Sequence, residues 1–190
     1  MNRSAVRAFC ILFSCLAYFE SFVAAQAPNR RASREPTYFS PDYQENDPLA
    51  HGRPPSDAVL PALLNTPEAR ENAGALQKLS HEDLRKIFSV VKIRLSDSNE
   101  VDEVALGHDP MSGADNDWFW IVRRSPGRPK VILSANGLSL ELLDSRTLGY
   151  KNIRTFWSAP SGVSITCIYH YDGKQYRLVH KYTKTVNPSQ

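Results

Sequence analysis

The chain has 190 residues, of which 42% are hydrophobic and 23% are charged, and its formal net charge at pH 7 is +3. This composition excludes a chain kept disordered by high net charge, and the near balance of charges argues against nucleic acid as a partner. The length is enough for one domain with a modest core.

The first 27 residues have the pattern of a secretory signal peptide. Arg3 and Arg7 precede an apolar run at 8–19, and the small residues at 23–27 supply a cleavage site of the A-x-A type. The run is shorter than the roughly 20 apolar residues of a spanning helix, and no other candidate follows, so we expect no transmembrane segment. The pattern predicts a secreted or periplasmic protein whose mature chain begins near Pro28.

Proline then dominates the composition. Eight of the thirteen prolines lie between positions 28 and 67, and apolar residues show little periodicity before position 59. Such a segment cannot bury enough apolar surface to offset its ordering entropy. We therefore expect a disordered arm at 28–59, a single globular domain at 60–184 and a short tail at 185–190.

The domain is expected to begin with two short helices. Thr66 followed by Pro67 is typical of a helix N-terminus and predicts a helix over 67–78. Ser80, with an acidic residue three positions later, predicts a second helix over 81–89. Together these helices would form a small cap.

Beyond the helices, apolar and polar residues alternate as they do in strands. Turn signals at Pro126-Gly127, Asn136-Gly137 and Asp172-Gly173 separate several of these segments. The alternating segments are 91–95, 104–106, 118–122, 130–134, 138–143, 151–157, 163–171 and 176–182. The fold class predicted is α+β, mostly β, with a short N-terminal helical cap followed by an antiparallel β-meander.

The strand region also shows internal similarity. Residues 97–104 align with 146–153, and the strands and hairpin that follow each segment match in kind. One interpretation is two diverged copies of a repeat, at about 90–134 and 138–182. The other is that any meander with strands of similar length looks repetitive.

The order of strand, polar loop, strand, aromatic strand and hairpin resembles the FG-GAP and VCBS-type β-repeats of small exported bacterial proteins. The resemblance covers about residues 90–181. The matching residues are Asp97, Asn99 and Glu103 in the first copy and Gly149, Tyr150, Asn152 and Ile153 in the second. It implies a calcium loop whose ligands would be Asp97, Asn99 and Glu103. Calcium takes about six to eight oxygen ligands, and Val101 stands where a third ligand is typical, so we expect neither calcium nor another cofactor.

No catalytic arrangement is recognisable in the sequence. Cys167 and His170 are three residues apart in a predicted strand, so their side chains should face opposite sides of the sheet. His108 with Asp109 matches no zinc spacing, and Ser161 lacks the context of a nucleophile elbow. We therefore predict a protein that is not an enzyme, with an unrecognised hydrolase as an alternative.

Charge and aromatic residues supply the binding candidates. Seven acidic residues and no Lys or Arg lie between 97 and 117, whereas 118–190 is strongly basic. The acidic segment is either neutralised internally or exposed as a lip that attracts a basic partner. Both faces of the strand at 118–122 are apolar, so its tryptophans are either covered by the helical cap or displayed. The candidate binding residues are Asp109, Asp115, Asp117, Trp118 and Trp120.

These observations favour an exported, non-catalytic binding or interaction module of the cell envelope, with a glycan or a protein as its partner. One alternative is an inhibitor-like protein that docks on a basic envelope enzyme such as lysozyme, through the acidic segment. The other is the unrecognised hydrolase.

Overall fold

The computed structural model describes residues 35–41, 47–112, 117–124, 128–159 and 161–185. The predicted signal peptide lies outside these residues, as does the predicted tail after Thr185. The described residues belong to one compact unit and form two antiparallel sheets with short helical pieces before most of the strands. The predicted fold class, mostly β with an N-terminal helical cap, is confirmed.

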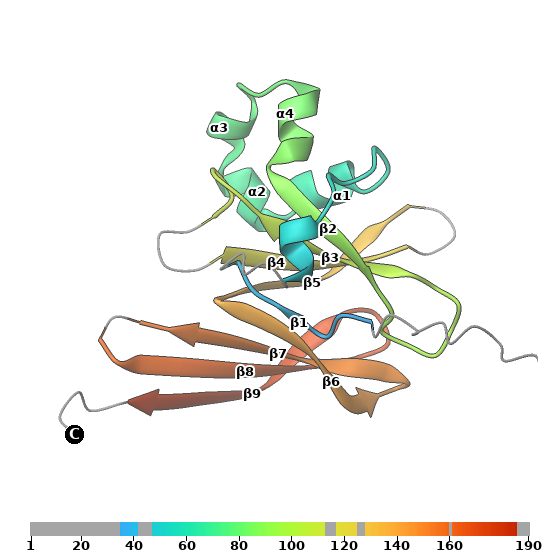
Figure 1. Ribbon diagram of the computed structural model, residues 1–190, viewed down its shortest axis with the longest axis vertical. Helices are drawn as coiled ribbons and strands as arrows, with labels where there is room; N and C mark the ends of the chain where they lie inside the picture. The colour runs from blue at the N-terminus through green and yellow to red at the C-terminus, as the bar shows by residue number, and fades with distance from the viewer. Residues whose placement is uncertain (1–34, 42–46, 113–116, 125–127, 160, 186–190) are drawn as a thin grey trace, which may run out of the picture. The chain divides into compact units, whose positions relative to one another are not determined.

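Each sheet contains one four-stranded meander (Figure 1). The four-stranded sheet has the order β2-β3-β4-β5, with bounds Phe88–Ile93, Asp102–Gly107, Asp117–Arg123 and Lys130–Gly137. The five-stranded sheet has the order β1-β6-β7-β8-β9, with bounds Tyr38–Phe39, Ser139–Thr147, Tyr150–Ser158, Val163–Tyr171 and Tyr176–Thr185. The segments 90–134 and 138–182, interpreted above as two copies, thus fall in different sheets.

The passage between the sheets differs from the prediction. Asn136-Gly137 is not a hairpin turn, because β5 continues to Gly137 and β6 begins at Ser139 in the other sheet. At this crossing a Cβ on Gly137 would lie 2.8 Å from the Phe156 carbonyl oxygen, and the Leu138 amide donates to that oxygen at 2.7 Å. Glycine is used here for close backbone approach and not for a turn.

The predicted hairpin at Asp172-Gly173 is confirmed. It joins β8 to β9, and Gly173 adopts a φ of +98°, which favours glycine. The Asp172 carboxylate accepts from the amides of Lys174 and Gln175, both at 2.8 Å.

The helical cap is more fragmented than predicted. Its pieces are η1 (Pro48–His51), α1 (Leu60–Leu64), α2 (Pro67–Glu71), α3 (Ala73–Leu76) and α4 (His81–Lys86). Thr66 and Ser80 are N-caps as expected, accepting from the amides of Ala69 and Asp83. The helix predicted over 67–78 is interrupted at Asn72, whose side chain instead donates to the Glu68 carbonyl at 3.0 Å.

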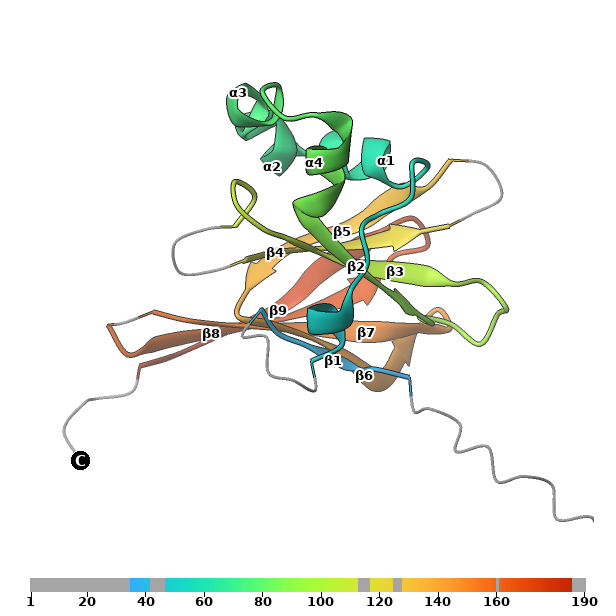
Figure 2. The same cartoon turned by 45° about the horizontal axis from the view of Figure 1, so that its top comes forward.

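The helices and the two sheets form three layers (Figures 1 and 2). Strand β4 shows how the sequence builds them. Trp120 and Val122 lie in a cluster with the helical cap, whereas Phe119 and Ile121 lie in the core shared by the two sheets. The period of two predicted at 118–122 therefore places one set of side chains on each face of the middle layer.

The proline-rich segment contributes to the core, so the prediction of a disordered arm is wrong for its described residues. Phe39 and Leu49 are fully buried in the core between the sheets, and β1 pairs with β6. The Asp47 carboxylate connects the segments that carry Phe39 and Leu49, because it accepts from the Ser40 amide at 2.6 Å and the Leu49 amide at 2.7 Å. Isolated apolar residues without periodicity gave no sign of this in the sequence.

The arm therefore matters for stability. We predict that Phe39→Ala lowers the free energy of unfolding by roughly 3 to 5 kcal/mol, because it empties a large site in the core. Tyr38→Ala is the matched control, since the adjacent Tyr38 side chain is 54% exposed and its loss should cost little. Urea unfolding of the two variants measures the difference. Equal midpoints for the two variants would mean that the arm does not contribute to the stability of the core.

Candidate functional site

The structure disperses the binding residues predicted from the sequence. Asp115 lies outside the described residues. Asp109 is exposed just beyond β3. Asp117 is half-buried at the start of β4, where its backbone forms an isolated antiparallel β-bridge with Ser112. Trp118 is half-buried against the cap.

Trp120 cannot contact a partner, and its prediction as a binding residue is wrong. Its side chain is fully buried under the helical cap. The ring packs edge-on against Phe88, with centroids 5.6 Å apart, and the indole Nε1 donates to a Glu68 carboxylate oxygen at 3.4 Å. The sequence left open whether the tryptophans are covered by the cap or displayed. Trp120 is covered.

The acidic segment is partly neutralised within the fold. Glu103 is buried and lies 2.9 Å from the Arg124 guanidinium. Asp97 lies 3.0 Å from Arg146, across the boundary between the two meanders. A third pair, involving Asp102, is described below. The interpretation as internal neutralisation is therefore correct for these residues.

The same ion pairs hold two of the three residues that the resemblance implies as calcium ligands at different places. Asp97 and Glu103 are held by different arginines, and Asn99 is exposed in the loop between β2 and β3. In the described part of the chain, no three His, Cys, Asp or Glu side chains are grouped so that they could hold a metal ion.

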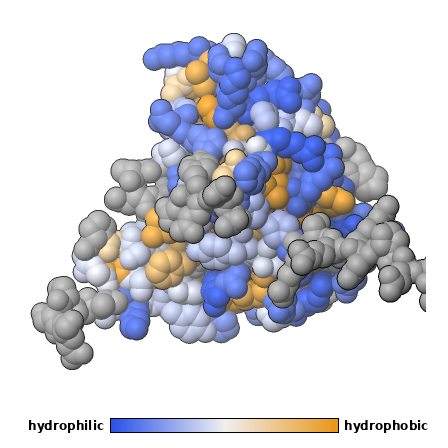
Figure 3. Space-filling model, in the orientation of Figure 1, coloured by the Kyte–Doolittle hydropathy of each residue, from blue (hydrophilic) through white to orange (hydrophobic). Residues whose placement is uncertain are grey.

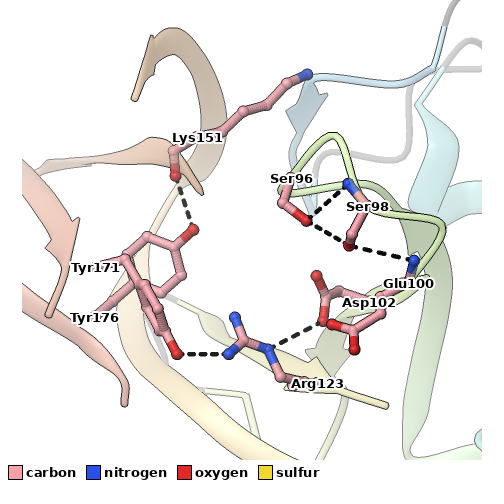
Figure 4. A network of polar contacts seen from close by, with 8 residues as sticks. All are labelled: Ser96, Ser98, Glu100, Asp102, Arg123, Lys151, Tyr171 and Tyr176. Carbon is pink, nitrogen blue, oxygen red and sulfur yellow. Dashed lines mark hydrogen bonds and ion pairs between the residues drawn. The ribbon is translucent and has the colours of Figure 1, made fainter. Parts of the chain in front are cut away.

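A buried polar network joins the two sheets at one end (Figure 4). Arg123, the last residue of β4, lies between Asp102 at the start of β3 and Tyr171 at the end of β8. Its Nε is 3.6 Å from the Asp102 carboxylate, and its Nη1 donates to the Tyr171 hydroxyl at 2.5 Å. The neighbouring Tyr176 donates to the Lys151 carbonyl at 2.7 Å.

Aromatic rings enclose the Arg123 guanidinium. Its central carbon is 4.4 Å from the centroid of the Tyr150 ring and 4.7 Å from that of Tyr171. Cation–π contacts of this kind are strongest where the cation is removed from water. The network therefore stabilises a cation that lies between the two sheets, and we assign it a structural role.

Burial affects the ionisation of Asp102, whose side chain is 1% exposed. Desolvation raises the pKa of Asp102 to about 6, and the nearby charge of Arg123 only partly opposes this rise. The distance of 3.6 Å is too long for a hydrogen bond, which leaves the carboxylate incompletely compensated.

A half-buried serine and histidine form the arrangement closest to a catalytic pair. Ser89 Oγ and His108 Nε2 lie 2.7 Å apart, and burial lowers the pKa of His108. Sequence reasoning considered His108 only as a metal ligand, because Ser89 is 19 residues away in the adjacent strand. Neither Ser89 nor His108 lines the two cavities between the helical cap and β5.

A cluster of exposed aromatic and basic side chains lies on one face of the five-stranded sheet. Residues paired across antiparallel strands share a face. One row runs Phe156, Thr166, Tyr182, and the next runs Arg154, Ile168, His180. Ile153 and Thr155, on the opposite face, are buried. We call the surface made by these two rows, together with His170 and Arg177, the outer face.

The outer face combines exposed rings with paired charges. Phe156 is 39% and Tyr182 58% exposed, and the ring of His180 stacks on that of Tyr182 with centroids 5.9 Å apart. Arg154 binds the Glu141 carboxylate with its Nε at 2.8 Å, and Arg177 binds Asp172 at 2.9 Å. The surface is thus aromatic and hydrogen-bonding, with little uncompensated charge.

Figure 3 shows the hydropathy of the surface in the orientation of Figure 1. Among the described residues visible there, hydrophobic ones occur in small groups between hydrophilic ones. Exposed large apolar side chains include Tyr38, Leu148, Phe156, Leu178, Val179 and Tyr182. Four of the six belong to β7 and β9, so the exposed large apolar side chains of the described residues concentrate in that part of the five-stranded sheet.

Comparison with protein-family models, with curated proteins and with solved structures found no match. In the described part of the chain, no helix is both long and apolar enough to cross a membrane.

The ionisation of Asp102 makes stability depend on pH. In the folded protein the pKa of Asp102 is about 6, above the usual value of 3.8 for an aspartate. The stability that protonated Asp102 adds is therefore fully present below about pH 4 and is lost as the pH rises through 6. We predict that this residue alone makes the protein roughly 2 kcal/mol less stable at pH 7 than near pH 4.

Burial lowers the pKa of His108, so this residue makes stability rise with pH, opposite to the effect of Asp102. The test therefore compares the parent with a variant that lacks only the Asp102 carboxylate. Urea unfolding from pH 4 to 7 should show that stability falls more steeply with pH in the parent than in Asp102→Asn. Parallel curves would contradict the assignment.

Proposed function

We propose that this chain is an exported, non-catalytic binding module of the cell envelope, and that its outer face binds an envelope glycan. The observation that carries the proposal is the row of exposed Phe156 and Tyr182 on a rigid sheet, on the side away from the helices and the four-stranded sheet. The signal-like sequence at 1–27 supports export.

The chemistry of the outer face favours a sugar over a charged ligand. Aromatic rings present apolar surfaces with little loss of side-chain freedom and stack on flat apolar faces. Arg154 and Arg177 are already neutralised by Glu141 and Asp172, so they offer directed hydrogen bonds but little net charge. A protein partner with an apolar anchor is the alternative for the same surface.

Two substitutions test the proposal. Phe156→Ala with Tyr182→Ala should weaken binding to purified cell-wall glycan by at least about tenfold, because both stacking rings are removed. Leu148→Ala, at the exposed turn between β6 and β7, should leave binding unchanged. Co-sedimentation with insoluble wall glycan and calorimetry with soluble fragments measure the effect. Capture of a protein with no glycan binding would select the alternative, and unchanged glycan binding by the double variant would refute the assigned surface.

Of the other functions considered, a hydrolase has one observation in its favour, the pair Ser89 and His108. An activated serine of this kind should react with a fluorophosphonate probe. Labelling of the parent that is lost in Ser89→Ala would support an enzyme. The inhibitor-like alternative is disfavoured by the ion pairs of Asp97 and Glu103, which consume part of the acidic segment.

A further inference from the structure

A groove lies between the helical cap and the edge of the four-stranded sheet, apart from the outer face. Its volume is about 400 Å³. Its lining comes from the turn between α1 and α2, from the start of β5, and from Gln175 and Tyr176. The lining residues are Ala62, Asn65, Thr66, Pro67, Pro129, Lys130, Val131, Ile132, Leu133, Ser134, Gln175 and Tyr176.

The groove runs along the backbone of β5. Six consecutive residues, 129–134, line it, although successive side chains of a strand point to opposite faces. A cavity that touches all of them must lie beside the strand and not on one face of the sheet. Strand β5 is the last in its sheet and pairs only with β4, so this edge has no strand partner in the described part of the chain.

A second hollow extends the groove along α1. Its volume is about 580 Å³, and it shares Ala62, Asn65 and Pro129 with the first. The two together are bordered by a helix on one side and a strand edge on the other. This is the arrangement in which an extended peptide can add to a sheet through main-chain hydrogen bonds.

Charge selects among possible occupants. Arg128 and Lys130 are exposed at the β5 side. The acidic residue of the second hollow, Asp57, is already within 4 Å of Arg85 and His81. The chain's own segment 28–34 is basic, with three arginines and no acid, so it is a poor match. An acidic segment fits better.

We propose that this groove binds an acidic, extended peptide segment of a partner protein, which adds as a fifth strand to the edge of β5. Main-chain hydrogen bonds would supply most of the affinity. Arg128 and Lys130 would select the charge, and α1 would cover the added strand. This site is independent of the glycan surface proposed above.

The test uses fluorescein-labelled octapeptides and measures anisotropy with the full mature chain. The first peptide alternates valine with glutamate, the second alternates valine with lysine, and the third is the glutamate peptide N-methylated at alternate residues. The glutamate peptide should bind at least about tenfold more tightly than the lysine peptide, and less tightly at high salt. N-methylation on the hydrogen-bonding edge should abolish binding.

Protein variants locate the site. Arg128→Glu with Lys130→Glu changes two exposed residues and should reverse the charge preference, so that the lysine peptide binds. Ala62→Trp should fill the groove and remove binding, whereas Ala50→Trp, at an exposed position on η1, should not. Hydrogen exchange should slow at 130–134 when the glutamate peptide is added.

The proposal is overturned if the glutamate peptide does not bind, or if Ala62→Trp binds it as the parent does. It is also overturned if hydrogen exchange slows at residues other than 130–134, or if it slows there because two copies of the chain associate. The Phe156→Ala and Tyr182→Ala double variant should bind the peptide normally, so failure of the glycan proposal and failure of this one are distinguishable.

Discussion

The burial of Arg123 between the two sheets is the constraint on which the rest of the structure depends. A guanidinium removed from water is costly unless its charge and its N–H groups are compensated. Here Asp102, the Tyr171 hydroxyl and two aromatic rings offset part of that cost, although the Nε and Nη2 atoms of Arg123 have no hydrogen-bond partner among the described residues. These partners come from both sheets, so Arg123 keeps all of them only when the sheets meet in one arrangement.

The network also relates the two meanders. Asp102 and Tyr150 each begin the second strand of their meander, and Arg123 and Tyr171 each end the third. The same strand ends of the two meanders therefore meet at one end of the core, with a charged residue from the first meander against a tyrosine from the second. This correspondence agrees with the interpretation of two diverged copies, and it shows how a divergence in residue type could have made the two halves complementary.

Fixing the sheets in this way determines which surfaces remain accessible. The four-stranded sheet is covered by the other sheet on one face and by the helical cap on the other. Among the surfaces that remain accessible in the described part of the chain are the outer face of the five-stranded sheet and the edge of β5. Tyr176 of the network and the core residues Ile132 and Leu133 line the groove beside β5. Substitutions at the exposed positions of the two surfaces, such as Tyr182 and Lys130, should therefore alter binding without disturbing the core.

Local patterns in the sequence were enough to predict the strands after position 90, the caps at Thr66 and Ser80, and the hairpin at Asp172-Gly173, because each depends on residues close together in the chain. The remaining features depend on distant partners. Phe39 and Leu49 carry no periodic signal, and Gly137 reads as a turn until the approach of Phe156 is known. Trp120 was predicted as a binding residue because alternation reveals two apolar faces but not what covers them. For the same reason, the exposure of Phe156 and Tyr182 became visible only once the register of β7, β8 and β9 was known.

The central claim, that Arg123 of the four-stranded sheet and Tyr171 of the five-stranded sheet hold the two sheets together, is tested most directly by a double-mutant cycle. Urea unfolding at neutral pH would compare the parent with Arg123→Met, Tyr171→Phe and the double variant. Each single substitution removes one partner of the hydrogen bond between the sheets, so the double variant should be more stable than the sum of the single effects predicts, by about 1 to 3 kcal/mol. Effects that add within about 0.5 kcal/mol would contradict the account.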